Sequence, residues 1–179
     1  AVEANCKFAI IESSSEGILQ HRQIGIHYDA MVFTNLTPEH IEAHRGFENY
    51  KNAKLEYFRN LQNLPHKIMN GQKVPKVIVV NTDDQYAKEF LNFNADQKIT
   101  YGQNSGELKS YNLQLSQQGI SFRVGDTDFN LHLKGKFDVY NALSALALTS
   151  RFAIDLNLAK HALEKIPNIV APQALGQFY

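Results

Sequence analysis

The sequence contains little cysteine and carries no net charge, and both features exclude classes of protein. A single cysteine, Cys6, cannot form an internal disulfide, so no disulfide framework holds the chain and a reducing compartment is expected. Eighteen basic residues balance eighteen acidic ones, whereas a dedicated nucleic-acid-binding domain is usually basic. No apolar run reaches the roughly 18 residues of a transmembrane helix, and residues 1–11 lack the cationic start and cleavage site of a signal peptide. We therefore expect a cytoplasmic protein without a nucleic-acid partner or a membrane span.

Several common catalytic motifs are also missing. None of the ten glycines lies in the pattern G-x-x-x-x-G-K-[ST], whose backbone N–H groups wrap a phosphate. Neither G-x-G-x-x-G nor G-x-S-x-G occurs. His40 and His44 are spaced for one helix face, but Ile41 stands where a zinc protease needs glutamate, so that class is disfavoured.

Short continuous apolar runs predict the buried strands of a parallel sheet. These runs are residues 7–11, 29–34 and 76–80, and residues 98–101 predict one more strand. Helical patterns follow the first three runs. One helix is expected to begin at Thr37 and Pro38, an amphipathic helix spans 47–64, and a third helix, 83–93, opens with two acidic residues.

The pattern changes after residue 107. Segments 108–115, 119–124 and 128–133 alternate apolar and polar residues between turns, which predicts an antiparallel β-meander over about 108–134. A buried helix is expected at 139–152 and an amphipathic helix at 156–166. The fold class is therefore α/β, a parallel sheet flanked by helices with an antiparallel meander. We expect residues 1–167 to form one domain, with 168–179 as a tail or linker.

Polar residues follow two of the predicted strands, at the sheet edge where α/β proteins bind ligands. Glu12 follows the first run and is placed either to hold Mg²⁺ or to belong to a helix-capping cluster; its local sequence favours capping. His40 follows the second strand, either as a ligand or as an ordinary solvated histidine. Lys54 lies within the amphipathic helix, where a lysine usually extends its amine to solvent.

Four segments carry a family resemblance. Residues 12–22 read ESSSEGILQHR, 33–54 read FTNLTPEHIEAHRGFENYKNAK, 81–84 read NTDD and 135–147 read GKFDVYNALSALA. In order and spacing they resemble the motifs E-[VL]-S-S-H-[GA]-L-x-x-x-R, F-T-N-L-[ST]-x-D-H-L-D-[YF]-H, N-x-D-D and G-x-[FH]-N-x-x-N of the Mur ligase central domain. The likeness is greatest to the MurE type, which adds the third residue to UDP-N-acetylmuramoyl-dipeptide.

The resemblance implies an ATP-dependent ligase of peptidoglycan synthesis that uses Mg²⁺ and joins an amino acid to a UDP-N-acetylmuramoyl-peptide. It implies that Glu12 and His40 are Mg²⁺ ligands and that Lys54 is a carbamylated lysine beside them. The remaining matched positions are implied to bind the two larger substrates. They are Ser14, Gln20 and Arg22 for the muramoyl substrate, and Asn141 with the neighbouring Asp138 for the adenine side.

The sequence also departs from the family pattern. Glu16 replaces histidine, Asp138 replaces asparagine, and both the G-T-[NK]-G-K-T loop and the G-R-x-E stretch are absent from residues 1–179. We therefore expect this chain alone to be inactive as a ligase fragment. Two alternatives are a degenerate, non-catalytic Mur-ligase-like binding protein and a folylpolyglutamate or poly-γ-glutamate type of ligase.

Overall fold

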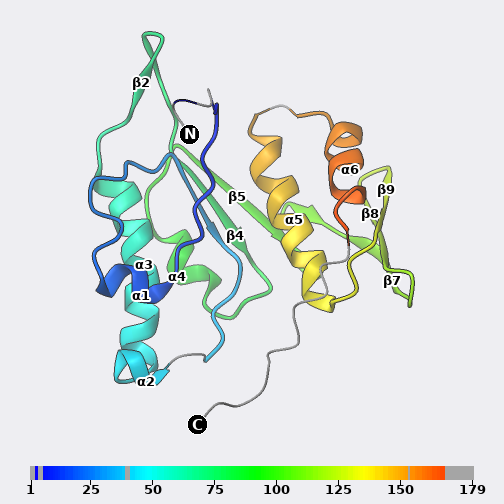
Figure 1. Ribbon diagram of the computed structural model, residues 1–179, viewed down its shortest axis with the longest axis horizontal. Helices are drawn as coiled ribbons and strands as arrows, with labels where there is room; N and C mark the ends of the chain where they lie inside the picture. The colour runs from blue at the N-terminus through cyan, green and yellow to red at the C-terminus, as the bar shows by residue number, and fades with distance from the viewer. Residues whose placement is uncertain (1–2, 4–5, 39–40, 153, 168–179) are drawn as a thin grey trace.

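The computed structural model describes residues 3, 6–38, 41–152 and 154–167 (Figure 1). Short strands and helices alternate along the first two thirds of the chain, and two helices follow the meander. In chain order the elements are α1 (Ser15–Leu19), β1 (Ala30–Phe33), α2 (Ile41–His44), α3 (Phe47–Asn63), β2 (Ile68–Met69), β3 (Gln72–Lys73), β4 (Val77–Asn81), α4 (Ala87–Leu91), β5 (Gln97–Gly102), β6 (Leu108–Lys109), β7 (Tyr111–Leu115), β8 (Ile120–Val124), β9 (Thr127–Leu131), α5 (Lys136–Ser150) and α6 (Leu156–Glu164).

A parallel sheet with the strand order β1-β4-β5-β6 forms the centre of the fold. All five residues of β4 are buried, because helices cover both faces of the sheet. Side chains alternate along a strand, so Val77 and Val79 join the core beneath α5, whereas Ile78 and Val80 join the core beneath α3 and α4. The continuous apolar run of this strand therefore reflects burial on two sides.

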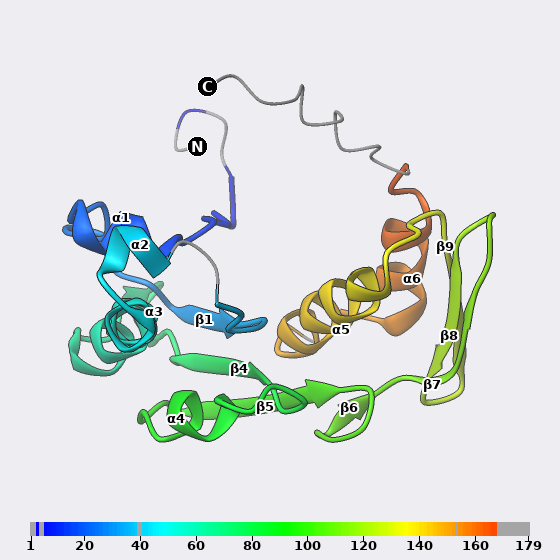
Figure 2. The same ribbon diagram turned by 90° about the horizontal axis from the view of Figure 1, so that it is seen from below.

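The strands β7, β8 and β9 form a separate antiparallel sheet. Figure 2 shows α5 between this meander and the parallel sheet, with α6 beside β9. Phe122 and Phe129 stack on adjacent strands with ring centres 5.2 Å apart, and both belong to the core that α5 covers. The carboxylate of Glu164 on α6 accepts a hydrogen bond from the backbone N–H of Asn130 at 2.8 Å.

Most predicted elements are confirmed, but the first strand is wrong. Residues 7–11 form no strand, and Phe8, Ile10 and Ile11 are 62%, 93% and 49% exposed. A strand requires a neighbour that supplies backbone N–H and C=O groups, and this segment pairs with none of the described strands. The apolar run at 7–11 therefore predicted a buried strand, whereas its large apolar side chains are exposed among the described residues.

Three other boundaries differ from the predictions. Helix α4 is shorter than the predicted 83–93, because Asp83 and Asp84 bind the backbone of other segments. The segment 108–115 is two strands, since β6 extends the parallel sheet and only β7 enters the meander. The predicted helix start at Thr37 and Pro38 is wrong, because these two residues are not helical and α2 covers only Ile41–His44. Within the described ranges, no helix has the length and apolarity needed to cross a membrane.

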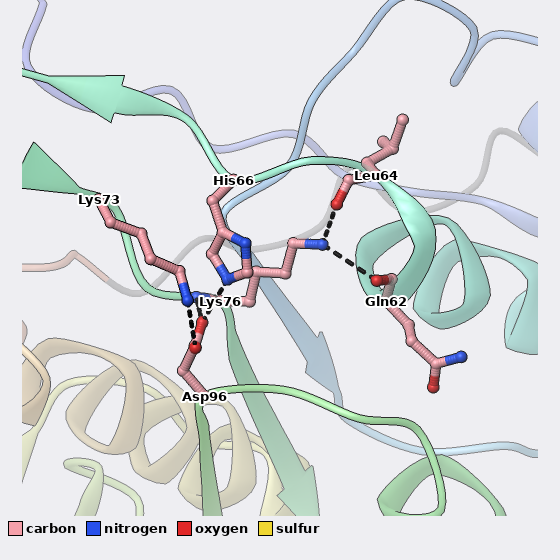
Figure 3. Close-up of polar contacts among 6 residues, drawn as sticks. All are labelled: Gln62, Leu64, His66, Lys73, Lys76 and Asp96. Atoms are coloured by element: carbon pink, nitrogen blue, oxygen red, sulfur yellow. Dashed lines mark hydrogen bonds and ion pairs between the residues drawn. The ribbon is translucent and has the colours of Figure 1, made fainter.

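A cluster of charged groups joins the amino ends of β4 and β5 (Figure 3). The carboxylate of Asp96 binds His66 Nε2 at 2.7 Å, Lys73 Nζ at 3.1 Å and the backbone N–H of Lys76 at 2.6 Å. These partners hold the pKa of Asp96 well below its usual range, with the Lys76 N–H contributing most. The buried ammonium of Lys76 in turn donates to the carbonyl of Gln62 at 3.1 Å, at the carboxyl end of α3.

We predict that Asp96→Asn lowers the free energy of unfolding at pH 7 by about 1–3 kcal/mol, as expected for hydrogen bonds to a charged group. Because the folded pKa of Asp96 is depressed, its stabilisation is complete above the unfolded pKa of about 4 and is lost as the pH falls toward the folded value. Urea denaturation at pH 7 and pH 3 measures both effects.

The matched control for this prediction is Asp126→Asn, at an exposed position in the turn between β8 and β9. We expect it to change the unfolding free energy by less than about 0.5 kcal/mol. Equal effects of the two substitutions at pH 7 would contradict the role assigned to Asp96.

Candidate functional site

The last residue of β4 and the residues just after it hold the carboxyl edge of the parallel sheet. The side-chain amide of the buried Asn81 donates to the carbonyl of Thr34, at 2.8 Å, just beyond β1. The carboxylate of Asp84 accepts a hydrogen bond from the backbone N–H of Leu36, also at 2.8 Å. The loop that leaves β1 in the direction of His40 is therefore anchored at two points.

Asp83 binds the loop between β5 and β6. Its carboxylate accepts backbone N–H groups from Gln103, Asn104 and Ser105 at distances between 2.7 and 3.2 Å. Partial burial opposes ionisation, but these N–H groups and the hydroxyls of Ser105 and Tyr140 hold the pKa of Asp83 below its ordinary value. Asp83 is therefore an anion at neutral pH, surrounded by donors.

Helix α1 is attached to α3 through its first turn. Ser14 is the N-cap and accepts the N–H of Gly17 at 3.2 Å, and the Tyr57 hydroxyl on α3 donates to the Ser14 carbonyl at 3.1 Å. Ser15 Oγ and His44 Nε2 are buried together, 2.9 Å apart. A Cβ at Gly17 would lie 2.8 Å from the Tyr57 hydroxyl, so glycine permits this close approach.

This attachment places the predicted substrate residues at the surface. Ser14, Gln20 and Arg22 are exposed along and just after α1. Glu12 is exposed as well, and its carboxylate has no hydrogen bond or ion pair to any other described residue. The capping interpretation of this segment is therefore realised by Ser14, while the Glu12 carboxylate stays available to a ligand.

Lys54 projects from α3 beside aromatic side chains. It is half-buried, and its Nζ lies 5.3 Å from the centre of the Tyr50 ring, as in a cation–π contact. Tyr50 is buried and meets the ring of His44 edge-on, with centres 5.4 Å apart. Since His44 also binds Ser15 of α1, Lys54 and the predicted substrate residues belong to one packed unit.

The predicted metal pair is only half described. His40 lies outside the described residues, so its distance from Glu12 stays a prediction. Among the residues whose positions are described, no group of three or more His, Cys, Asp or Glu side chains is arranged to hold a metal ion.

The first turn of α5 carries the predicted nucleotide-side residues. The carboxylate of Asp138 accepts the backbone N–H of Gly135 at 2.9 Å and lies 3.5 Å from the side-chain amide of Asn141. Asp138 therefore caps the helix from its third position, which explains why a carboxylate is accommodated there. Phe137, on the same turn, is 69% exposed.

A surface groove lies beside the α1–α3 contact. It has a volume of about 600 Å³ and runs between α1, the end of α2 and one face of α3. None of the sequence-predicted site residues lines it. Its lining residues are Ile18, Leu19, His44, Arg45, Asn49, Asn52, Ala53, Glu56 and Arg59.

The predicted residues thus form two sets. Figure 2 shows α1 and α3 on one side of the carboxyl end of β1, and α5 on the other side. Sequence reasoning missed Tyr57 and His44, which position the first set, and Tyr140, which binds Asp83 beside the second. Their roles depend on partners 29 to 57 positions away in the chain, so no local pattern signals them.

Comparisons with known proteins identify the family of this chain. The Mur ligase middle domain family matches residues 1–149. The UDP-N-acetylmuramoyl-L-alanyl-D-glutamate--2,6-diaminopimelate ligase of Clostridium botulinum is 33% identical over 176 residues, which covers 94% of this chain and 33% of the relative. The UDP-N-acetylmuramyl-tripeptide synthetase of a Roseiflexus species is 31% identical over 176 residues, covering 93% of this chain and 34% of the relative.

Solved structures share the fold. A structure of UDP-N-acetylmuramoyl-L-alanyl-D-glutamate--2,6-diaminopimelate ligase superposes with a TM-score of 0.76 at 26% identity, over 93% of this chain and 34% of that chain. The MurF ligase of Thermotoga maritima in complex with ADP superposes with a TM-score of 0.63 at 15% identity, over 84% of this chain and 33% of that one, which shows the fold alone. The chain spans about a third of the length of the curated relatives named above. The family match, the sequence identity and the shared fold together establish that the chain belongs to the Mur ligase family and carries its middle domain.

Proposed function

We propose that this chain is the middle part of an ATP-dependent ligase that joins an amino acid to a UDP-N-acetylmuramoyl-peptide in peptidoglycan synthesis. In this reaction a substrate carboxylate takes the terminal phosphoryl group of ATP, giving an acyl phosphate and ADP. The amine of the amino acid then displaces phosphate and forms the amide bond. The names of the curated relatives support muramoyl-peptides over folates as the substrate class.

The observation that carries the proposal is the attachment of α1 to α3, which combines anion-binding groups with Lys54 in one unit. Arg22 offers a guanidinium, Gln20 an amide and Ser14 a hydroxyl, all exposed on or beside the same short helix. A guanidinium binds carboxylate or phosphate oxygens through paired hydrogen bonds. These three groups bind and orient the anionic muramoyl-peptide.

The metal side of the proposal rests on Glu12, His40 and Lys54. The exposed Glu12 carboxylate suits Mg²⁺, which prefers oxygen ligands, and His40 completes the pair. When bound, Mg²⁺ supplies neutralisation of charge on the transferred phosphoryl group. A carbamylated Lys54 places a negative charge beside this pair where the unmodified side chain would place a positive one.

The nucleotide side of the proposal is the first turn of α5. Asn141 offers a side-chain amide to the purine edge, and Asp138 caps the beginning of the helix by accepting the backbone N–H of Gly135. Phe137 adds an exposed flat apolar surface on the same turn, suited to stacking against a base. The Thermotoga maritima MurF ligase, which shares this fold, was solved with ADP.

We predict that the 179-residue chain alone does not catalyse ligation, because no loop in it cradles the β- and γ-phosphates. The measurement is phosphate release from ATP in the presence of UDP-N-acetylmuramoyl-dipeptide and mixed amino acids. Ligation by this chain would contradict the prediction. In a longer protein that contains the chain, inhibition by folate substrates would favour the folylpolyglutamate-type alternative, and lack of both activities would favour the non-catalytic one.

We predict that Lys54 gains one CO₂ in bicarbonate buffer, as the family resemblance implies for this position. Lys51 is the matched control on the same helix. Lys51 donates hydrogen bonds to the carboxylates of Glu89 and Glu48, which raise its pKa, so its amine stays protonated and is expected to stay unmodified. Peptide mass spectrometry under mild conditions distinguishes the two lysines, and a gain that persists in Lys54→Ala would refute the assignment.

We predict that ADP shifts the amide NMR signals of residues 136–141. Phe137→Ala should raise the dissociation constant for ADP at least about fivefold, because it removes a ring on which the base stacks. Phe152→Ala is the control, since Phe152 is also a partly exposed aromatic residue but packs against Phe8. Millimolar ADP that leaves these signals unmoved in the unsubstituted chain would exclude α5 as the nucleotide side.

A further inference from the structure

A hydrogen bond joins the beginning of α5 to the carboxyl edge of the parallel sheet. The hydroxyl of Tyr140 donates to Asp83 Oδ2 at 3.1 Å. Asp83 follows β4, and Tyr140 lies two residues beyond Asp138 on α5, so the bond spans 57 positions of the chain. The same carboxylate is held by the loop at 103–105, which makes it a fixed acceptor for the tyrosine.

The remaining contacts of α5 with the sheet are mainly apolar. Val139, Leu143 and Leu146 are fully or almost fully buried against the sheet and the meander. Apolar packing is non-directional and by itself sets the rotation and axial position of a helix loosely, whereas a hydrogen bond to a fixed anion is directional. The Ser144 side chain, one turn further along α5, also hydrogen-bonds Tyr101 of β5. The bond from Tyr140 is the directional contact nearest the beginning of α5, so it holds the first two turns relative to the sheet edge.

We propose that Asp83 and Tyr140 are positioning residues for the nucleotide, through their control of the start of α5. They fix the turn that bears Phe137, Asp138 and Asn141 without being placed to contact a base themselves. This inference rests on the proposed function of α5 as the nucleotide side. It assigns to the 81–84 segment a task distinct from that of Asn81 and Asp84, which hold the loop after β1.

The chemistry of the pair fits a permanent link. Burial, the hydrogen bond to Asp83 and the charge of that carboxylate raise the pKa of Tyr140 to about 12, so the phenol is a proton donor at neutral pH. The lowered pKa of Asp83 keeps its partner an acceptor over the same range. Neither group changes its charge near pH 7, so the link is a fixed support.

The test is Tyr140→Phe, which removes one hydroxyl and leaves the loop around Asp83 in place. Amide hydrogen exchange at residues 140–142, whose N–H groups bond to the first turn of α5, should accelerate about tenfold. Exchange in the 103–105 loop and in β4 should stay unchanged. Tyr57→Phe is the matched control, since it removes a hydroxyl bond of the same 3.1 Å length from the α1–α3 contact.

Unchanged exchange at 140–142 in Tyr140→Phe would overturn the proposal, and so would an equal acceleration throughout the chain, which would indicate general stability only. An ADP titration separates this inference from the proposed function. We expect Tyr140→Phe to weaken ADP binding at least about threefold, because it loosens the turn that bears the nucleotide residues. Tyr57→Phe should leave ADP binding unchanged, because the hydrogen bond that it removes joins α1 to α3. ADP binding that is equal in all three proteins overturns the positioning role. If the unsubstituted chain binds no ADP, the assignment of α5 to the nucleotide is wrong. The positioning role for a nucleotide is then wrong too, even if amide hydrogen exchange shows that the Tyr140 bond orders α5.

Discussion

The structure depends on how a buried parallel sheet satisfies the polar groups where its central strand ends. β4 is covered on both faces, so the residues that follow it leave an apolar core and enter a crowded edge. An unpaired polar group there costs more than a typical hydrogen bond returns. Asn81, Asp83 and Asp84 solve this by binding the backbone of segments 20 to 48 positions away. The same bonds that satisfy the edge also shape the loops around it.

The two ends of β4 are constrained by different chemistry. At its amino end, Lys76 binds the carboxyl end of α3, and Asp96 gathers Lys73, His66 and a backbone N–H. At its carboxyl end, uncharged amides and hydroxyls surround Asp83. The charged cluster joins helix α3 to the sheet, whereas the groups at the carboxyl edge hold the loops that follow β1 and β5. The carboxyl edge of a parallel sheet is where α/β proteins generally bind ligands, which is why the proposed site is assigned there.

The proposed function assigns the two large substrates to two separately held parts of the fold. On one side, Tyr57 and His44 fasten α1 to α3, so Arg22 and Lys54 share a unit. On the other side, α5 covers the opposite face of the sheet, and its Tyr140 binds Asp83 just beyond β4. A ligase must hold a nucleotide and an acceptor in a fixed relative geometry, because this positioning lowers the entropic part of the reaction barrier. The carboxyl edge is the rigid element common to both parts.

Much of this protein follows from the sequence alone. The apolar runs predicted β1, β4 and β5 because buried parallel strands are continuous in hydrophobicity, and the periodicity of residues 47–64 predicted α3. The ordered motifs identified the family, because four segments match its pattern in order and spacing. Tertiary structure alone decided that residues 7–11 stay unpaired, that residues 108–109 join the parallel sheet, and that Asp83 binds a loop and Tyr140 instead of starting a helix. Hydrophobicity and helical periodicity are local properties of a chain, whereas strand pairing and the partner of a carboxylate depend on segments that only the folded backbone brings together.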